Sequence, residues 1–204
     1  MPFIEFQVLW QGELKPFSCK QLYTEMALTA DRIAAIARET LDNQNKNATG
    51  NLYRDVVWEM PLGDKGFTLT FPFKKSPYWN FVDKGVQGFA SNAKAPNSPF
   101  KFGSGTGPKG KLIPAIDKWT IAKGLPETRD ARGRFVPRQQ MVKRIARSVY
   151  LYGIKPTYFI SDPFAMLYTQ AIPKLEKAFK LDVEDFLTKN MPEEMGVTFK
   201  ISIG

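Results

Sequence analysis

The stretch from residue 48 to residue 88 constrains the fold more than any other part of the sequence. It contains a run of β-forming residues at 52–60, a connection rich in proline and glycine, and an alternating run at 67–73. Two such runs are typical of a β-hairpin with one apolar face. The aromatic segment at 78–82 then fits either a third strand or a single helical turn. No residue in this stretch is typical of catalysis, so it indicates a role in building a structure.

Helical periodicity predicts four helices outside this stretch. Apolar residues recur at three- and four-residue spacing after Ser18, a suitable helix cap, and after Asp162, which precedes Pro163. Pro173 is expected to kink or divide the last helix. The predicted helices cover residues 18–45, 113–123, 139–152 and 162 to about 187.

Two further stretches, at residues 2–10 and 197–203, alternate apolar and polar residues over the length of a strand. Strands and helices are mixed without a repeating strand–helix–strand order, which predicts an α+β fold. The expected sheet is mixed or antiparallel, has about four to five strands, and is packed by the long N-terminal helix and C-terminal helices. Residues 1–204 are expected to form a single domain.

A long insertion interrupts this pattern. Residues 84–111 are rich in glycine, proline and lysine and contain no acidic residue, which predicts a flexible basic loop. Residues 112–138 are predicted to form a helical and charged insertion. The glycines of 105–110 match a nucleotide-binding pattern, but Leu112 stands where a phosphate-binding loop has Ser or Thr. A nucleotide site is therefore not expected.

The content of reactive residues argues against an enzyme. The sequence has no histidine and one cysteine, Cys19, which excludes serine triads with a histidine base and zinc sites built from His and Cys. The acidic residues show no paired spacing of the kind that metal or general-acid sites use. We therefore expect no catalytic residue, no bound metal and no cofactor.

The formal net charge of +9 has two interpretations, an anionic partner or a solvated lysine-rich surface. The N-terminal apolar run contains Glu5 and has no basic region before it, so no signal peptide is expected, and no apolar run reaches membrane-spanning length. The basic residues of the loops are the candidate contacts with DNA or with a protein partner. They are Lys94, Lys101, Lys109, Lys111, Arg129, Arg132, Arg134 and Arg138.

The order of several short motifs carries a family resemblance. A long predicted helix leads into a T-G-x-L turn, then the predicted hairpin, then a segment of the type Y-x-x-F-V-D-x-G, and a Pro-Phe pair opens the last helix. This order resembles the tail-completion and head–tail joining proteins of tailed bacteriophages, over about residues 20–190. Residues 116–119 and 145–148 are also similar to longer neck proteins of phages that infect Bacteroidetes. The motif residues are Thr49, Gly50, Leu52, Tyr78, Val82, Asp83, Gly85, Pro163 and Phe164.

The resemblance implies a structural subunit of a ring in the virion, at the neck below the portal or at the top of the tail. Such a ring is made in the host cytoplasm, has roughly six- or twelve-fold symmetry, and contacts other neck, portal or tail proteins without any membrane. Packaged DNA would pass through it and touch it without sequence preference. The insertion at 84–139 exceeds the compact family pattern. A stand-alone, basic nucleic-acid-binding protein is the second hypothesis, and an enzyme is a distant third.

Overall fold

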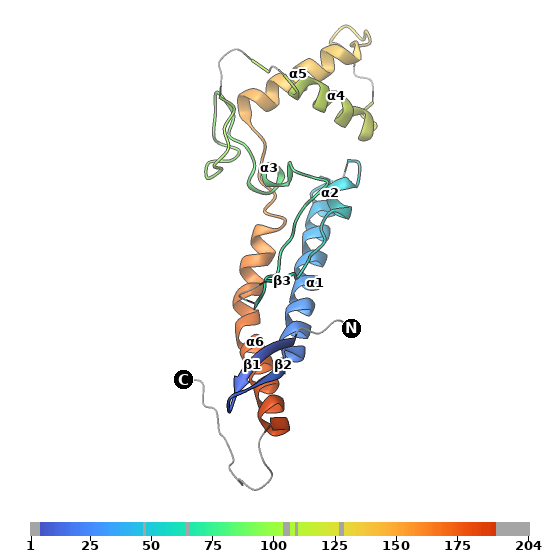
Figure 1. Cartoon of the computed structure of the whole chain (residues 1–204). Coiled ribbons are helices and arrows are strands. Elements are labelled where there is room, and N and C mark those ends of the chain that lie inside the picture. The colour runs from blue at the N-terminus through green and yellow to red at the C-terminus, as the bar shows by residue number, and fades with distance from the viewer. Residues whose placement is uncertain are drawn as a thin grey trace. The chain divides into compact units, whose positions relative to one another are not determined.

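The computed structural model describes residues 5–46, 48–63, 66–103, 107–108, 110–126 and 129–190 (Figure 1). The chain divides into two compact units, each made of segments that are distant in sequence. Unit 1 comprises Met1–Ala35, Trp58–Thr70 and Pro163–Gly204, and unit 2 comprises Ile36–Val57 and Phe71–Asp162. The expected single domain remains a prediction.

Helices predominate, so the expected α+β fold with a sheet of about four to five strands is wrong. The described residues form six helices and two antiparallel sheets of two strands each. The predicted hairpin exists, but its strands β3 (Leu62–Gly63) and β4 (Gly66–Phe67) are very short. A single further bridge joins Glu59 to Thr70. Pro61 and Pro72 lack backbone N–H donors, which limits how far such a ladder extends.

The β-forming run after residue 50 begins as a helix and not as a strand. Helix α2 (Asn51–Arg54) starts at Gly50, whose φ of 70° lies in the left-handed region. The turn at Gly50 therefore leads into α2 and not into a strand. The backbone N–H of Asp55 donates to the carbonyls of Asn51 and Leu52, so these local bonds prevail over strand propensity.

In unit 1, a tight hairpin precedes the first long helix. Strands β1 (Glu5–Trp10) and β2 (Glu13–Ser18) pair antiparallel, with Trp10 opposite Glu13. Gln11 and Gly12 both have positive φ, as a two-residue hairpin turn requires. The first predicted strand is confirmed over its described residues, whereas β2 was not predicted.

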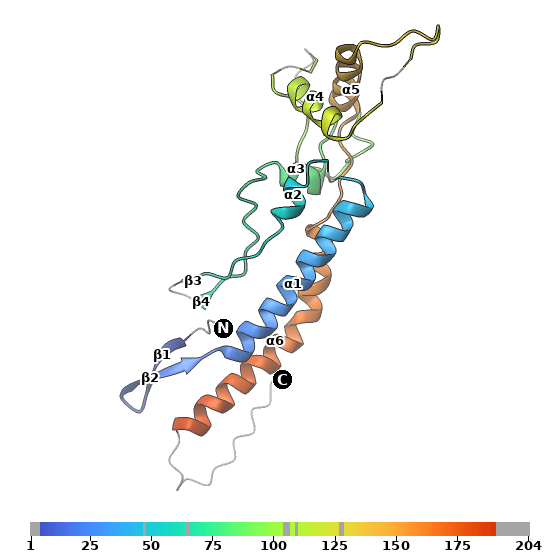
Figure 2. The same cartoon turned by 90° about the vertical axis from the view of Figure 1, so that its right-hand side faces the viewer.

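The long helices of unit 1 lie side by side in both views of the fold (Figures 1 and 2). They are the first part of α1 (Lys20–Asn43) and most of α6 (Ser161–Asn190). The two carboxylate oxygens of Asp182, on α6, accept hydrogen bonds from the backbone nitrogens of Gln21 and Leu22, each at 2.9 Å. A carboxylate at this position satisfies N–H groups that have no partner within the helix.

Aromatic rings fix the β1–β2 hairpin onto α6. Phe186 packs edge-to-face against Trp10 at 5.6 Å between ring centroids and against Phe17 at 5.4 Å. Helix α6 also continues through Pro173 and is not divided there. Ala171 and Ala178, on either side of this proline, are buried, and their packing offsets part of the cost of the lost backbone hydrogen bond.

Unit 2 contains the remaining helices, α3 (Trp79–Lys84), α4 (Leu112–Ala122) and α5 (Arg138–Tyr152). Helices α4 and α5 pack side by side and confirm the predicted helices at 113–123 and 139–152 (Figures 1 and 2). Of the two readings of residues 78–82, the helical one is correct. Phe73 is buried between Trp79, on which it stacks at 4.6 Å, and Phe159, which it meets edge-to-face.

The basic loop at 84–111 contains no helix or strand in its described interior. Gln87 nevertheless holds it together, since its backbone N–H donates to Phe100 at 2.8 Å and its carbonyl accepts from Phe102 at 3.0 Å. The N–H groups of Phe89 and Ala90 donate to carbonyls at the end of α5. The flexibility of this loop remains a prediction. The predicted strand at 197–203 lies outside the described residues.

Candidate functional site

One motif, through Val82, Asp83 and Gly85, packs in unit 2 against a segment that is distant in sequence. We call this place the motif junction (residues 82–86, 153–157 and 160–161). Asp83 is fully buried there. Its carboxylate accepts hydrogen bonds from the backbone nitrogens of Ile160, at 3.1 Å, and Ser161, at 3.2 Å, and from the Ser161 hydroxyl. Asp83 therefore caps the start of α6.

The prediction that Asp162 caps this helix is wrong. Helix α6 begins at Ser161, so Asp162 and Pro163 lie within its first turn. Asp162 is exposed, and its backbone N–H donates to Tyr158. Asp83 occupies the capping position because Thr157 ties its segment in place: the Thr157 hydroxyl donates to the carbonyl of Val82 at 2.9 Å.

Two glycines allow the backbones of the junction to approach closely. Gly85 and Gly153 have φ of 69° and 77° with ψ near 180°, a region that only glycine populates readily. A Cβ atom on Gly85 would lie 2.5 Å from the Ile154 carbonyl oxygen, and one on Gly153 would lie 2.2 Å from that of Val86. The antiparallel bridge between Val86 and Ile154 fits between these two glycines.

The other motif residues have mixed surroundings. Leu52 and Pro163 are buried, whereas Tyr78 and Phe164 are each 43% exposed. The carbonyl of Thr49 accepts a hydrogen bond from Arg54 at 3.0 Å. These contacts give several motif residues a structural role, while Thr49 and the two aromatic rings are exposed and available to a partner.

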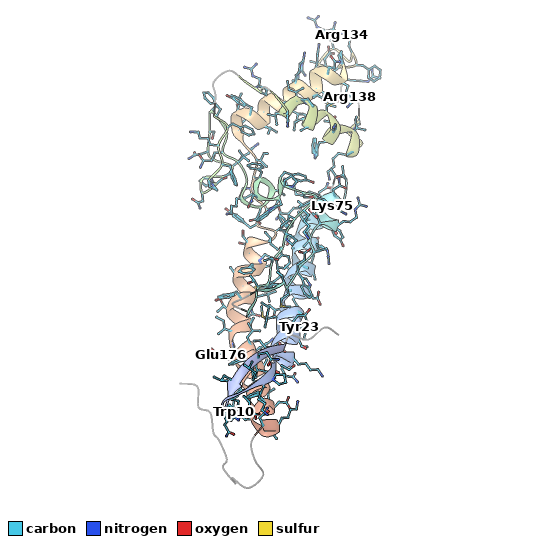
Figure 3. All side chains as sticks on the ribbon, viewed as in Figure 1. Trp10, Tyr23, Lys75, Arg134, Arg138 and Glu176 are labelled. Atoms are coloured by element: carbon cyan, nitrogen blue, oxygen red, sulfur yellow. The ribbon has the colours of Figure 1, made fainter. Side chains whose placement is uncertain are left out.

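The predicted arginine contacts are largely paired within the chain. Arg134 forms an ion pair with Asp130 at 2.9 Å, and Arg138 forms one with Asp117 at 2.6 Å. The guanidinium of Arg129 stacks over the exposed ring of Phe135 at 3.9 Å. Figure 3 labels Arg134 and Arg138 near the start of α5.

The Asp130 carboxylate accepts hydrogen bonds from Arg132 and Arg134 and so stabilises the turn at 130–134. Hydrogen bonds from the backbone and the side chain of Arg134 and from the backbone of Arg132 hold its pKa below the ordinary value, and Arg144 adds to the effect. Asp130 therefore stays ionised and offsets part of the positive charge. Arg132 is exposed, and its side chain remains available to a partner.

The predicted lysines that the structure describes lie at the surface. Lys94, Lys101 and Lys111 are exposed; the Lys94 ammonium lies 6.0 Å from the ring centroid of Tyr152, and Lys111 stands at the start of α4. Lys109 lies outside the described residues.

The structure adds a lysine cluster, consisting of Lys46, Lys94, Lys123 and Lys155, of which only Lys94 was predicted. Burial lowers the pKa of Lys46 from its ordinary value, and repulsion from Lys123, Lys155 and Lys94 lowers it further. These residues come from four separate segments and follow no period in the sequence. The folded chain brings these four lysines together, and the sequence itself contains no pattern that groups them.

The remaining candidates for chemistry are weak. Cys19 is buried, and burial together with the negative charge of Asp182 raises the pKa of its thiol to about 11. Across the described residues, no group of three or more His, Cys, Asp or Glu side chains is arranged to hold a metal ion. Within the same part of the chain, no helix has both the length and the apolar character to cross a membrane.

Comparison with known proteins adds no relative. No family model, no curated protein and no solved structure matches this chain.

Proposed function

We propose that the chain is a structural subunit of a tailed bacteriophage, in the head–tail connector (neck) or in the tail-completion ring. The observation that supports the proposal most is the motif junction. The resemblance rests on short motifs separated by tens of residues, and Asp83 and Gly85 of one motif pack against the segment 153–161 that precedes another. This contact joins one motif to the segment just before another, and so it links two motifs that are distant in the sequence.

An exposed apolar stripe on α6 also supports assembly. Phe164, Tyr168, Ile172 and Phe179 follow helical spacing along this helix, and they are 43%, 57%, 40% and 45% exposed. The rings of Phe164 and Tyr168 stack on each other at 6.0 Å. Exposed apolar side chains grouped on one face of a helix are typical of contacts between proteins. In a ring, each subunit presents one patch to a different patch on the next.

Assembly is the direct test. The purified chain would be mixed with the products of the neighbouring reading frames, and particle mass and negative-stain images would be recorded. We expect closed rings, and we expect antibodies against the chain to label the junction of head and tail in virions. A chain that stays monomeric with every neighbouring product, and that is absent from virions, contradicts the proposal.

A matched pair of variants sharpens this test. Tyr168→Ser with Ile172→Ser interrupts the apolar stripe and is expected to abolish ring formation while leaving the helical signal in circular dichroism unchanged. Leu9→Ser with Leu14→Ser removes two exposed apolar side chains of the β1–β2 hairpin instead and serves as the control. Equal assembly by both variants would exclude the stripe as the ring contact.

A basic nucleic-acid-binding protein is the second candidate, and the lysine cluster favours it. The two functions differ in how the isolated chain behaves. A stand-alone DNA-binding protein binds duplex DNA tightly as a monomer and loses affinity steeply as salt is added. A ring subunit binds DNA weakly as a monomer and oligomerises with its protein partners.

A further inference from the structure

The lysine cluster is positioned by the turn that follows α1. The Lys123 ammonium donates to the backbone carbonyl of Asn45 at 2.7 Å and to its side-chain oxygen at 2.5 Å. Next to it, the Gln44 side-chain amide donates to the carbonyl of Thr157 at 3.1 Å. The turn at 44–46 is therefore tied both to the end of α4 and to the segment that carries Lys155.

Lys94 is also held in place. Its loop is fixed by the side-chain amide of Gln87, which donates to the carbonyls of Pro96 at 3.2 Å and Ser98 at 2.8 Å. Ala95, next to Lys94, is buried. The Lys94 ammonium lies against the ring of Tyr152, three positions before Lys155 in the chain. The segments that carry these lysines are thus held by contacts within the chain, so the cluster does not depend on mobile loops.

The charges of this cluster are not balanced locally. The structure shows no ion pair for these four ammonium groups within the described residues, and Lys46, Lys94 and Lys155 are exposed. Like charges held close together oppose each other's charged forms. A bound anion removes this repulsion, so the arrangement favours an anionic ligand over an empty surface.

We propose that the lysine cluster binds the phosphodiester backbone of duplex DNA. The inference rests on the proposed function, because it assigns the place where a neck subunit touches the packaged DNA. Ammonium groups bind phosphates as point charges, without the planar pairing that arginine makes with carboxylates. Four of them on separate segments match a repeating anion better than a single carboxylate. Contacts of this kind are independent of base sequence.

The test compares two triple variants of the full chain that have the same net charge. One is Lys46→Gln, Lys94→Gln and Lys155→Gln, which spares the structural bonds of Lys123. The control is Lys20→Gln, Lys174→Gln and Lys177→Gln, which removes three exposed lysines from unit 1. Fluorescence anisotropy with a short labelled DNA duplex would be measured over a range of salt concentrations. Thermal melting would show that both variants remain folded.

The cluster variant is expected to bind DNA more weakly than the wild type. Its plot of log K against log salt is expected to be less steep by roughly 2.7, because three phosphates are no longer neutralised. The control variant keeps the wild-type slope. Equal losses in both variants, or no loss in either, overturn the proposal. Displacement of the DNA by polyglutamate as effectively as by inorganic polyphosphate also overturns it, in favour of an acidic protein partner.

Ring assembly of the same variants separates the two proposals. A cluster variant that assembles with the neighbouring proteins, but whose affinity for DNA depends less on salt than that of the wild type, supports both proposals. A wild-type chain that never assembles, yet shows the difference in slope, contradicts the neck function and supports the DNA site.

Discussion

The buried carboxylate of Asp83 accepts hydrogen bonds from both the backbone nitrogen and the hydroxyl of Ser161, which lies 78 residues further along the chain. It thereby satisfies the N–H groups at the start of the longest helix, α6 (Figure 2). A residue that the sequence marks only as part of an aromatic motif thus determines where a distant helix begins.

Asp83→Ala is expected to lower the free energy of unfolding by roughly 3 kcal/mol, because it leaves the buried N–H of Ile160 and the half-buried N–H of Ser161 without an acceptor. Asp162→Ala is the matched control, since it removes an exposed acid from the first turn of the same helix. It should cost only about 0.3–1 kcal/mol, through the loss of a favourable interaction with the helix dipole. Urea denaturation of both variants checks this, and a larger loss for Asp162→Ala would restore it as the cap.

Gly85→Ala is expected to destabilise the chain by roughly 3 kcal/mol or more, because the new methyl group meets the Ile154 carbonyl and the backbone lies in a glycine-only region. Gly103→Ala provides the control, since nothing lies within 4 Å of its added Cβ. Melting temperatures would be compared. Equal melting of the two variants would contradict the close approach at the motif junction.

Asp182→Ala is expected to weaken the start of α1 by roughly 2 kcal/mol, since two backbone N–H groups lose their charged acceptor. Asp185→Ala, one turn further along α6, removes an acid that is paired with Lys189 at the surface. Such surface pairs contribute about 0–1 kcal/mol. Amide hydrogen exchange should show faster exchange at residues 21 and 22 only in the first variant.

The rate of alkylation of Cys19 should show that the pKa of its thiol is raised. With its thiol pKa raised to about 11, the thiolate fraction at pH 8 is roughly 100-fold lower than for a cysteine of ordinary pKa. Iodoacetamide should therefore react slowly with the folded chain and rapidly after denaturation. Reaction of the folded chain at the rate of a free cysteine would contradict the burial of Cys19.

The same shift links the stability of the chain to pH. The unfolded chain loses the thiol proton near the ordinary value of 9.0, and the folded chain loses it near 11. The contribution of Cys19 is therefore fully present below pH 9 and is lost as the pH rises towards 11. Cys19→Ser lacks this contribution, so its unfolding midpoint in urea should fall less between pH 8 and pH 11 than that of the wild type.

The helices could be predicted from the sequence because their signals are local. Periodic apolar residues predicted α1, α4, α5 and α6 to within a few residues. The expected sheet failed because the β-forming residues at 52–60 are also suited to a buried, irregular segment. Val56 is fully buried there, and its carbonyl accepts a hydrogen bond from Arg38 at 2.5 Å.

The candidate sites could be predicted only in part, because the contacts that form them join residues that are distant in the sequence. The arginines of 129–138 were grouped by their proximity in the sequence, but the pairing of Arg134 with Asp130 and of Arg138 with Asp117 appears only in the folded chain. Lys46, Lys123 and Lys155 were not singled out, because 109 positions separate the first of them from the last. Only the folded backbone brings such residues to one surface.

The capping of α1 by Asp182 has a consequence for synthesis. The ribosome must add 160 residues after Leu22 before the carboxylate that completes this helix exists. The first amides of the nascent helix therefore face water until residue 182 has been made. Fragments that stop short of residue 182 should bind chaperones, whereas products that include this residue and fold should be released.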